Sequence, residues 1–277
     1  MSIAARNAIL AGGGSQPSGG YWGLCFTAED SNCVVNMSKT GTPPAVTLET
    51  SPDGMTWTAF DADGGTTPIT LAAVGDKVYF RAGSGGNTSL SRSLLNNRRF
   101  TLSGHCGASG DVSSLLDASS SVLSLSERPY AFLGLFNGCA SLTTAPLLPA
   151  TTLGQNCYQR MFVGCSSLTV APMLPATTAA ATCYNAMFQG CSSLTSAPLL
   201  PIITLAQNCY VNLFGGCSSL VDIEVRFLEW SGATNNWLTN VAASGTFYCP
   251  TALGTDATIT RGNSNCPAGW TVVNTDA

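Results

Sequence analysis

The sequence contains little charge. Only 9% of its 277 residues are charged, against roughly 25% in an average soluble domain. The 11 basic residues form no cluster larger than the pair Arg98-Arg99, and the 15 acidic residues bring the net charge to −4. Binding to nucleic acid requires clustered basic side chains that neutralise phosphates. We therefore do not expect nucleic acid as a partner.

Long apolar runs are also absent. No stretch approaches the roughly 18 unbroken apolar residues of a membrane-spanning helix, so we expect no membrane insertion. Hydrophobic residues nevertheless make up 45% of the chain. This content is ample for a folded core and argues against disorder.

Histidine is almost missing, which limits catalytic and metal-binding chemistry. The one histidine, His105, precedes Cys106 in a glycine-rich segment, and the nearest acid that follows is Asp111. A Ser-His-Asp or Cys-His site therefore lacks an evident group to orient the base. Cysteines within the repeats are 8 and 18 residues apart, unlike the close pairs of zinc sites. We predict a protein that is not an enzyme and that holds no cofactor and no metal.

The first 20 residues have the composition of a peptide on a tether. Ile3, Ile9 and Leu10 can line one stripe of a short helix within residues 1–11, and residues 12–20 form a glycine-rich linker. The apolar segment before the first glycine is too short for the core of a secretory signal. We predict a docking peptide that binds a partner. A frayed or truncated terminus is the alternative.

Residues 21–104 have the pattern of an antiparallel β-sandwich. Runs rich in β-branched and aromatic residues alternate with glycine-rich turn signals at a spacing near ten residues, which is typical of small sandwiches. The predicted strands are Tyr21–Phe26, Cys33–Ser38, Ala45–Glu49, Thr56–Phe60, Ile69–Leu71, Lys77–Arg81 and Arg98–Leu102. Residues 105–129 are expected to form a connector and N-terminal cap.

Residues 130–234 repeat themselves with a period of 26 residues. A fixed period with apolar residues in register is typical of leucine-rich solenoids, in which each turn buries its apolar residues by stacking on its neighbours. We predict short strands near Leu142–Leu147, Leu168–Met173 and Leu194–Leu199. The recurring positions are Phe136, Phe162, Phe188 and Phe214; Cys139, Cys165, Cys191 and Cys217; and Leu142, Leu168, Leu194 and Leu220.

The predicted fold is therefore mainly β with short helical turns. An N-terminal antiparallel β-sandwich is followed by a leucine-rich-repeat-type solenoid of 26-residue units. Residues 235–277 are expected to form a C-terminal cap. The acidic residues Asp222, Glu224 and Glu229 could supply a carboxylate pair of the glycosidase kind, but we interpret them as surface charges of that end.

The 12 cysteines include a group at the repeat positions and two non-repeat pairs. Seven of them occupy repeat positions beside leucine and phenylalanine, and a free cysteine behaves as a small buried hydrophobe. We interpret these as a ladder of reduced thiols in the core, with disulfides inside one unit, such as Cys157–Cys165, as the alternative. The non-repeat pairs Cys25/Cys33 and Cys249/Cys266 each close a short loop and are the candidates for disulfides.

Several segments resemble the BspA-type leucine-rich repeat. They are Leu148-Pro-Ala-Thr-Thr152, Met161-Phe162, Gly164-Cys165-Ser-Ser-Leu168, Pro175 and the tail Gly245-Thr-Phe-Tyr-Cys-Pro250. The segments Leu24–Ala28 and Val74–Arg81 are similar to the β module that often precedes such repeats. This family is common in surface proteins of gut bacteria and in proteins of their phages. The resemblance implies the fold and, for function, adhesion or protein interaction.

A row of variable polar residues on the repeats is the candidate ligand-binding surface. Between Pro129 and Val221 the only charged residue is Arg160, so this surface consists of amides and hydroxyls. Such a row suits a neutral glycan or an uncharged protein face, whereas purely structural polar ladders are the alternative. The candidate residues are Gln159, Arg160, Asn185, Gln189 and Asn212.

Two main hypotheses of function follow. The first is a virion protein of a phage of gut bacteria, a head or tail fibre or decoration protein on the virion surface. Residues 1–11 would bind a capsid or tail protein, and the repeats would meet a host surface glycan or protein, in symmetric copies such as a homo-trimer. The second is an adhesin of the bacterial cell surface; a purely structural capsid decoration is a third. The lack of a recognisable signal sequence favours the first.

Overall fold

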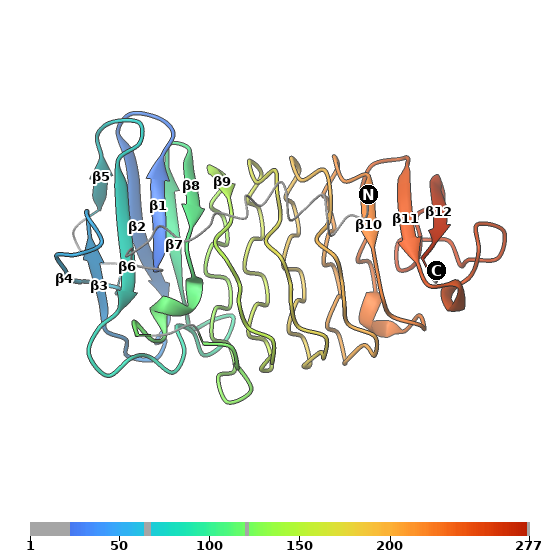
Figure 1. Ribbon diagram of the computed structural model, residues 1–277, viewed down its shortest axis with the longest axis horizontal. Helices are drawn as coiled ribbons and strands as arrows, with labels where there is room; N and C mark the ends of the chain where they lie inside the picture. Colours follow the sequence, from blue (N-terminus) through green and yellow to red (C-terminus); the bar gives the residue numbers. More distant parts are fainter. Residues whose placement is uncertain (1–22, 64–67, 120–121, 276–277) are drawn as a thin grey trace.

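The computed structural model describes residues 23–63, 68–119 and 122–275 (Figure 1). The predicted docking peptide (1–11) and linker (12–20) lie outside these residues. Strands dominate the regular structure, and the helices of the described part are short 3₁₀ helices. The prediction of a mainly β chain with short helical turns is confirmed.

The strands lie in three sheets, none of them closed. The strands are β1 (Leu24–Ala28), β2 (Cys33–Thr40), β3 (Leu48–Ser51), β4 (Thr58–Phe60), β5 (Ile69–Leu71), β6 (Lys77–Ala82), β7 (Asn97–Ser103), β8 (Cys106–Ser109), β9 (Leu142–Thr144), β10 (Asp222–Glu224), β11 (Gly245–Cys249) and β12 (Trp270–Asn274). The 3₁₀ helices are η1 (Val112–Leu115), η2 (Gly232–Thr234) and η3 (Thr251–Leu253).

Two of the sheets form the N-terminal part of the molecule. One has the order β4-β3-β6-β1-β8-β9 and the other β5-β2-β7. Pairing is antiparallel throughout, except that β8 and β9 are parallel. Phe26 of β1 and Phe100 of β7 meet with ring centroids 4.9 Å apart, so the two sheets bury apolar side chains against each other. Each of the seven strands predicted between residues 21 and 104 overlaps an observed strand.

Alternation of side chains explains why these segments are strands. In β2, Cys33, Val35 and Met37 are buried while the residues between them are partly exposed. In β6, Val78 and Phe80 point inward in the same way. A period of two places apolar side chains on one face of a strand, so each strand contributes one row to the core.

The 26-residue units stack side by side along the long axis of the molecule (Figure 1). Within a unit, alternate backbone N–H groups donate to the following unit: Phe162 N lies 2.8 Å from Met187 O, and Gly164 N lies 2.8 Å from Gln189 O. The N–H groups between them close turns inside the unit, as from Val163 to Arg160 O at 3.3 Å. Neighbouring units are therefore held by backbone hydrogen bonds at fixed register.

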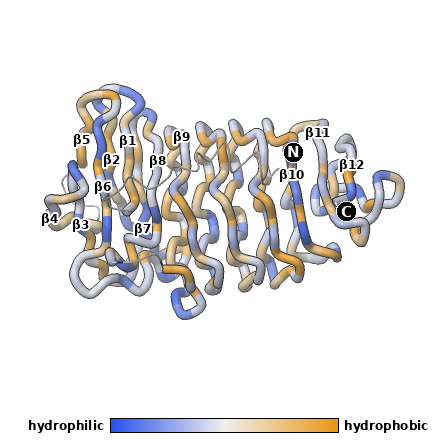
Figure 2. Tube along the Cα trace, viewed as in Figure 1, coloured by the Kyte–Doolittle hydropathy of each residue, from blue (hydrophilic) through white to orange (hydrophobic). Residues whose placement is uncertain are grey.

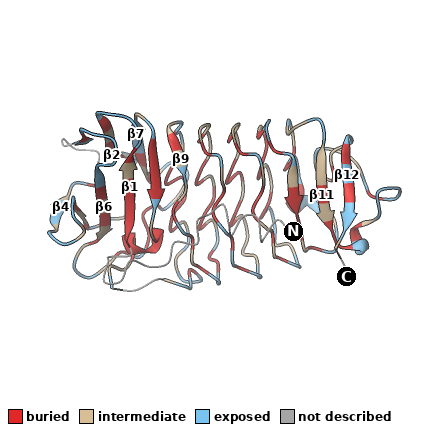
Figure 3. Ribbon diagram, turned by 45° about the horizontal axis from the view of Figure 1, so that its top comes forward, coloured by how far each residue is buried: buried red, intermediate tan, exposed pale blue. Residues whose placement is uncertain are grey.

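Two columns of aromatic rings run through the stack. In the phenylalanine column, Phe136, Phe162, Phe188 and Phe214 lie with successive ring centroids 5.3, 5.6 and 5.5 Å apart and with planes within 4° of parallel. The second column consists of Phe132, Tyr158, Tyr184, Tyr210 and Trp237. Every unit contributes a hydrophobic and buried segment at the same place (Figures 2 and 3). The stacking of the four phenylalanines agrees with the prediction from the repeat period.

A column of cysteines lies beside the phenylalanines. The thiols of Cys165, Cys191 and Cys217 donate to the carbonyl oxygen of the phenylalanine in the preceding unit, at 3.2, 3.2 and 3.0 Å. All these cysteines are buried and unbridged. The prediction of a ladder of reduced core thiols is confirmed.

The strands predicted within the repeats are shorter than expected. Strand β9 ends at Thr144 instead of Leu147. The stretches near 168–173 and 194–199 form no strand and keep only single parallel bridges, Thr144 to Val170 and Ser196 to Asp222. Prolines such as Pro172 and Pro198 follow these bridges and lack the N–H that a ladder needs. Proline therefore interrupts the pairing.

The C-terminal part continues the stack with a parallel sheet. Strands β10, β11 and β12 pair in that order. Trp270 is buried, and its Nε1 donates to Ala242 O at 2.8 Å. Phe247 of β11 packs against Trp230 and Trp237. Large aromatic side chains thus cover the last repeat, where no further unit follows within the described residues.

The phenylalanine column begins in the N-terminal sheets. Phe100 of β7 stacks on Phe136 with centroids 5.7 Å apart, its N–H donates to Leu135 O at 2.7 Å, and its carbonyl accepts the Cys139 thiol at 3.2 Å. These contacts repeat those between two units. Strand β7 therefore serves the first repeat as a preceding unit would.

Replacement of Phe162 by alanine tests the phenylalanine column. The ring is fully buried between two others, so Phe162→Ala is expected to lower the free energy of unfolding by about 3–5 kcal/mol through lost burial and a cavity. The control Met173→Ala removes a side chain that is 53% exposed, and we expect a change within about 0.5 kcal/mol. Urea denaturation measures both, and equal small losses would contradict the packing described.

Candidate functional site

Neither disulfide predicted from the sequence is present, since all 12 cysteines are free. Cys25 lies in β1, and its thiol faces the carbonyl of Phe26 at 3.6 Å. Cys33 lies in the other sheet and donates to the carbonyls of Asp30 and His105, both at 3.1 Å. The loop between β1 and β2 crosses from one sheet to the other. The predicted disulfide between Cys25 and Cys33 is therefore wrong, and the two residues are separate thiols.

The pair Cys249/Cys266 is corrected in the same way. The Cys249 sulfur lies 4.0 Å from Gly254 O at the end of β11. The Cys266 sulfur accepts from Arg261 Nη1 at 3.2 Å. Each thiol thus has its own neighbours, which proximity in the sequence did not reveal.

The predicted row on the repeats is only partly accessible. Gln159 is 8% exposed, and its side-chain amide accepts from Asn156 Nδ2 at 2.8 Å and donates to Asn185 Oδ1 at 3.3 Å. The structure thus brings Gln159 and Asn185 together as an amide ladder. Arg160, Gln189 and Asn212 are half-buried on the same stack.

The backbone imposes a constraint on this row that the sequence analysis missed. Arg160, Ala186 and Asn212 share one unit position, and their φ angles are 57°, 53° and 56°. Side chains with a Cβ rarely adopt this left-handed region, although asparagine tolerates it. Left-handed residues recur every fourth position, for example at 156, 160 and 164. The glycine conserved in every unit at the last of these positions was the available signal.

His105 acquires an acidic partner through the fold. Its Nδ1 lies 2.8 Å from Asp30 Oδ2, and its backbone N–H donates to the same oxygen at 2.8 Å. These bonds, the backbone one foremost, lower the pKa of Asp30. Among the described residues no hydroxyl or thiol hydrogen-bonds to the ring. The pair joins two loops, and the sequence could not show it because the residues are 75 positions apart.

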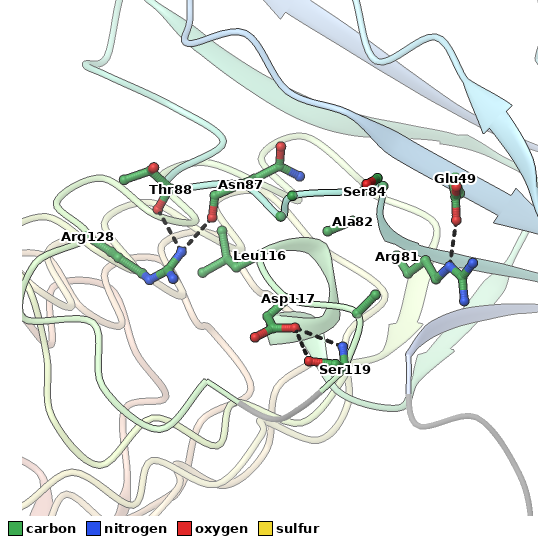
Figure 4. Close-up of a pocket in the computed structure, with 14 residues that line it drawn as sticks. Glu49, Arg81, Ala82, Ser84, Asn87, Thr88, Leu116, Asp117, Ser119 and Arg128 are labelled. Atoms are coloured by element: carbon green, nitrogen blue, oxygen red, sulfur yellow. Dashed lines mark hydrogen bonds and ion pairs between the residues drawn. The ribbon is translucent and has the colours of Figure 1, made fainter.

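A groove of about 700 Å³ lies beside the N-terminal sheets (Figure 4). Glu49 and Arg81 lie at one end, Arg128 lies at the other, and Asp117 and Ser119 lie along one side. Glu49 belongs to β3, Arg81 belongs to β6, and the two residues are directly paired across these strands. The loop 83–88 and the segment that follows η1 supply most of the remaining wall.

Each charged side chain of the groove already has a protein partner. Arg81 Nε lies 2.7 Å from Glu49 Oε2, and the Arg81 guanidinium lies 4.1 Å from the centroid of the Trp57 ring. Asp117 Oδ1 accepts from the N–H and hydroxyl of Ser119 at 2.8 and 2.7 Å. Arg128 donates to the carbonyls of Asn87 and Thr88. The groove therefore offers hydroxyls and backbone groups rather than unpaired charge.

Glycine shapes the loop that borders the groove. A Cβ on Gly86 would lie 2.7 Å from Leu116 O, and its φ is +67°. Only glycine fits both requirements. Around Gly85 a Cβ would meet nothing within 4 Å, so the backbone there is open to a ligand.

Within the described residues no cluster of histidine, cysteine and acidic side chains could hold a metal ion. In that same part of the chain, no helix has the length and apolar character to cross a membrane.

Comparison with protein-family models, with curated proteins and with solved structures finds no match in any of the three.

The buried thiols generate a prediction about pH. Burial raises the pKa of Cys139 and Cys217 to about 12, from 9.0 for an accessible thiol. Because the pKa of these thiols is higher in the folded than in the unfolded state, their contribution to the free energy of unfolding is fully present below pH about 9. This contribution is lost as the pH rises toward 12, where the folded protein must bury a thiolate or unfold. We expect the free energy of unfolding, measured with urea, to fall steeply between pH 9 and 11.

We also expect the thiols of the native protein to resist Ellman's reagent at pH 8 until urea unfolds the chain. Rapid reaction of most thiols in the native protein would contradict their burial.

Proposed function

We propose that the protein is a non-enzymatic recognition protein that binds a neutral, hydroxyl-rich ligand in the groove beside the N-terminal sheets. The observation that supports this most is the state of the four charged residues there: Glu49, Arg81, Asp117 and Arg128 are each held by protein partners. Carboxylates held in this way are poor candidates for general acids or bases, because they do not face a reacting group. A neutral glycan or an uncharged polar peptide is the ligand class that fits.

The stacked units support a finer interpretation of the fold. We infer that residues 130–234 are a leucine-rich-repeat-type solenoid of the BspA kind and that the N-terminal sheets form a β-sandwich. Unit-to-unit hydrogen bonds and the phenylalanine column support this inference. Such a stack is a stiff support for a binding site, because each unit contacts its neighbours over its whole length.

We extend the proposal to the location of the protein. A virion surface of a phage of gut bacteria, with residues 1–11 bound to a capsid or tail protein, fits a rigid module that carries a recognition groove. The bacterial cell surface is the alternative. Several copies on one particle, for example as trimers, would turn weak identical contacts into useful avidity.

Adhesion of the purified protein to host cells tests the proposal. Ser84 is exposed in the loop of the groove, so Ser84→Trp is expected to fill the groove and to weaken adhesion by about tenfold, or about 1.4 kcal/mol. The matched control Ser218→Trp places the same side chain at an exposed position of the repeats and is expected to leave adhesion unchanged. Binding to a neutral ligand should change little between low and physiological salt, because screening acts on charges.

The outcomes separate the hypotheses. Joint replacement of the repeat row (Gln159, Arg160, Asn185, Gln189 and Asn212) by alanine tests the surface that the sequence indicated. Loss of adhesion in this variant, together with full adhesion of Ser84→Trp, would contradict the groove and move the site to the repeats. No adhesion by folded protein to any host cell would favour a structural capsid decoration.

A further inference from the structure

A second, smaller cavity lies where strand β7 meets the first repeats. Its volume is about 130 Å³. Thr40, Leu94, Asn97 and Arg99 line it from the N-terminal sheets, and Leu133, Gly134, Asn137 and Arg160 line it from the repeats. None of the residues that line the larger groove belongs to it, so the two hollows are separate.

Two guanidinium groups line this cavity without an acidic neighbour in its wall. Four other arginines of the described residues are paired with carboxylates: Arg81 with Glu49, Arg98 with Asp63, Arg226 with Glu224 and Arg261 with Asp256. Within the part of the chain that the structure describes, the side chains of Arg99 and Arg160 make no ion pair. In a protein with net charge −4, two adjacent unpaired arginines are a local concentration of positive charge.

One donor of Arg160 is buried and lacks an acceptor. Its Nε is shielded from solvent and has no hydrogen-bond partner among the described residues. A buried donor of a charged group without an acceptor costs several times the net free energy of an ordinary hydrogen bond. An oxygen ligand in the cavity would supply the missing acceptor.

Arg160 also stands at a position that disfavours it. The backbone there is left-handed, with φ of 57°, and the equivalent positions of the next two units carry Ala186 and Asn212. Of these three units, only the one beside the cavity has arginine. The left-handed conformation itself recurs in every unit of the stack, so the backbone does not explain why a guanidinium stands at this one level.

The size and donor set of the cavity select the ligand. A volume of about 130 Å³ is below the roughly 300–1,000 Å³ of sites that enclose a whole drug-sized molecule. Guanidinium groups bind carboxylate and phosphate through paired N–H donors, and Thr40 and Asn137 can add neutral donors. We propose that the cavity between Arg99 and Arg160 binds one oxyanion group, either a phosphate or the carboxylate of an acidic sugar.

Calorimetric titration of the full-length protein tests this site with three probes. These are inorganic phosphate, the methyl glycoside of N-acetylneuraminic acid, and the methyl ester of that glycoside, which lacks the charge. We expect phosphate or the acidic glycoside to bind at millimolar or lower concentration, and we expect the ester not to bind. Binding of phosphate alone identifies a phosphate site, whereas binding of the glycoside identifies the carboxylate of a sugar.

Two variants assign the binding to this cavity. Arg160→Asn introduces the residue that the chain itself carries at the equivalent position 212 with the same backbone conformation, so the fold is expected to tolerate it. Arg99→Gln changes the other arginine within β7. Each of the two variants is expected to weaken binding at least about tenfold. The control Arg92→Asn removes the same charge from an exposed residue outside the cavity and is expected to change the binding affinity less than about twofold.

Three results would overturn the inference. The first is that neither phosphate nor the acidic glycoside binds up to about 10 mM, which corresponds to about 2.7 kcal/mol of affinity. The second is that the folded variants Arg160→Asn and Arg99→Gln bind as tightly as the unchanged protein. The third is that the uncharged ester binds as tightly as the acidic glycoside. The titration involves no cells and no residue of the larger groove. Its failure would therefore leave the proposed adhesion untouched, and failure of adhesion would leave this site untouched.

Discussion

Hydrogen bonds from alternate backbone N–H groups of one unit to the carbonyls of the next are the constraint on which the rest of the structure depends. They hold Phe162 N at 2.8 Å from Met187 O and repeat at Phe136 and Phe188. Because register is fixed in this way, a side chain lies directly over its equivalent in the neighbouring unit. Parallel rings 5.3–5.6 Å apart are the result. A smaller residue at one level would leave a cavity, which explains why phenylalanine and cysteine recur unchanged.

The same bonding joins the repeats to the N-terminal sheets. Phe100 provides the carbonyl, the N–H and the ring that a preceding unit would provide. The buried side chains of both parts consequently belong to one continuous core. Polar hollows remain at the edges of this core, where loops and strands of different origin meet. The groove with Arg81 and the small cavity with Arg160 are both of this kind.

The sequence pattern was sufficient to predict the features that depend on neighbouring residues or on the repeat period, namely the strands and the stacked side chains. Runs of β-branched and aromatic residues between turn signals predicted strands such as Cys33–Ser38 and Lys77–Arg81, which the structure extends by one or two residues. The 26-residue period predicted the stacked phenylalanines and the free core thiols. Features that depend on chain crossings were missed. The loop between β1 and β2 separates Cys25 from Cys33, and the fold brings Asp30 to His105. Proline shortened the expected strands. The groove was not predicted either, because β3, β6 and the segment after η1 meet only in the folded chain.

Native-state hydrogen exchange tests the central claim, that one register of backbone bonds unites the sheets and the repeats. The amide hydrogens to follow are those of Phe100, Phe136, Phe162 and Phe188, each of which donates to the next level of the stack. The account predicts that all four exchange with one common free energy, equal to that of global unfolding, because none of the levels can open alone. Slow exchange at Phe100 with much faster exchange at Phe162 and Phe188 would show that the repeats open independently, and would contradict it.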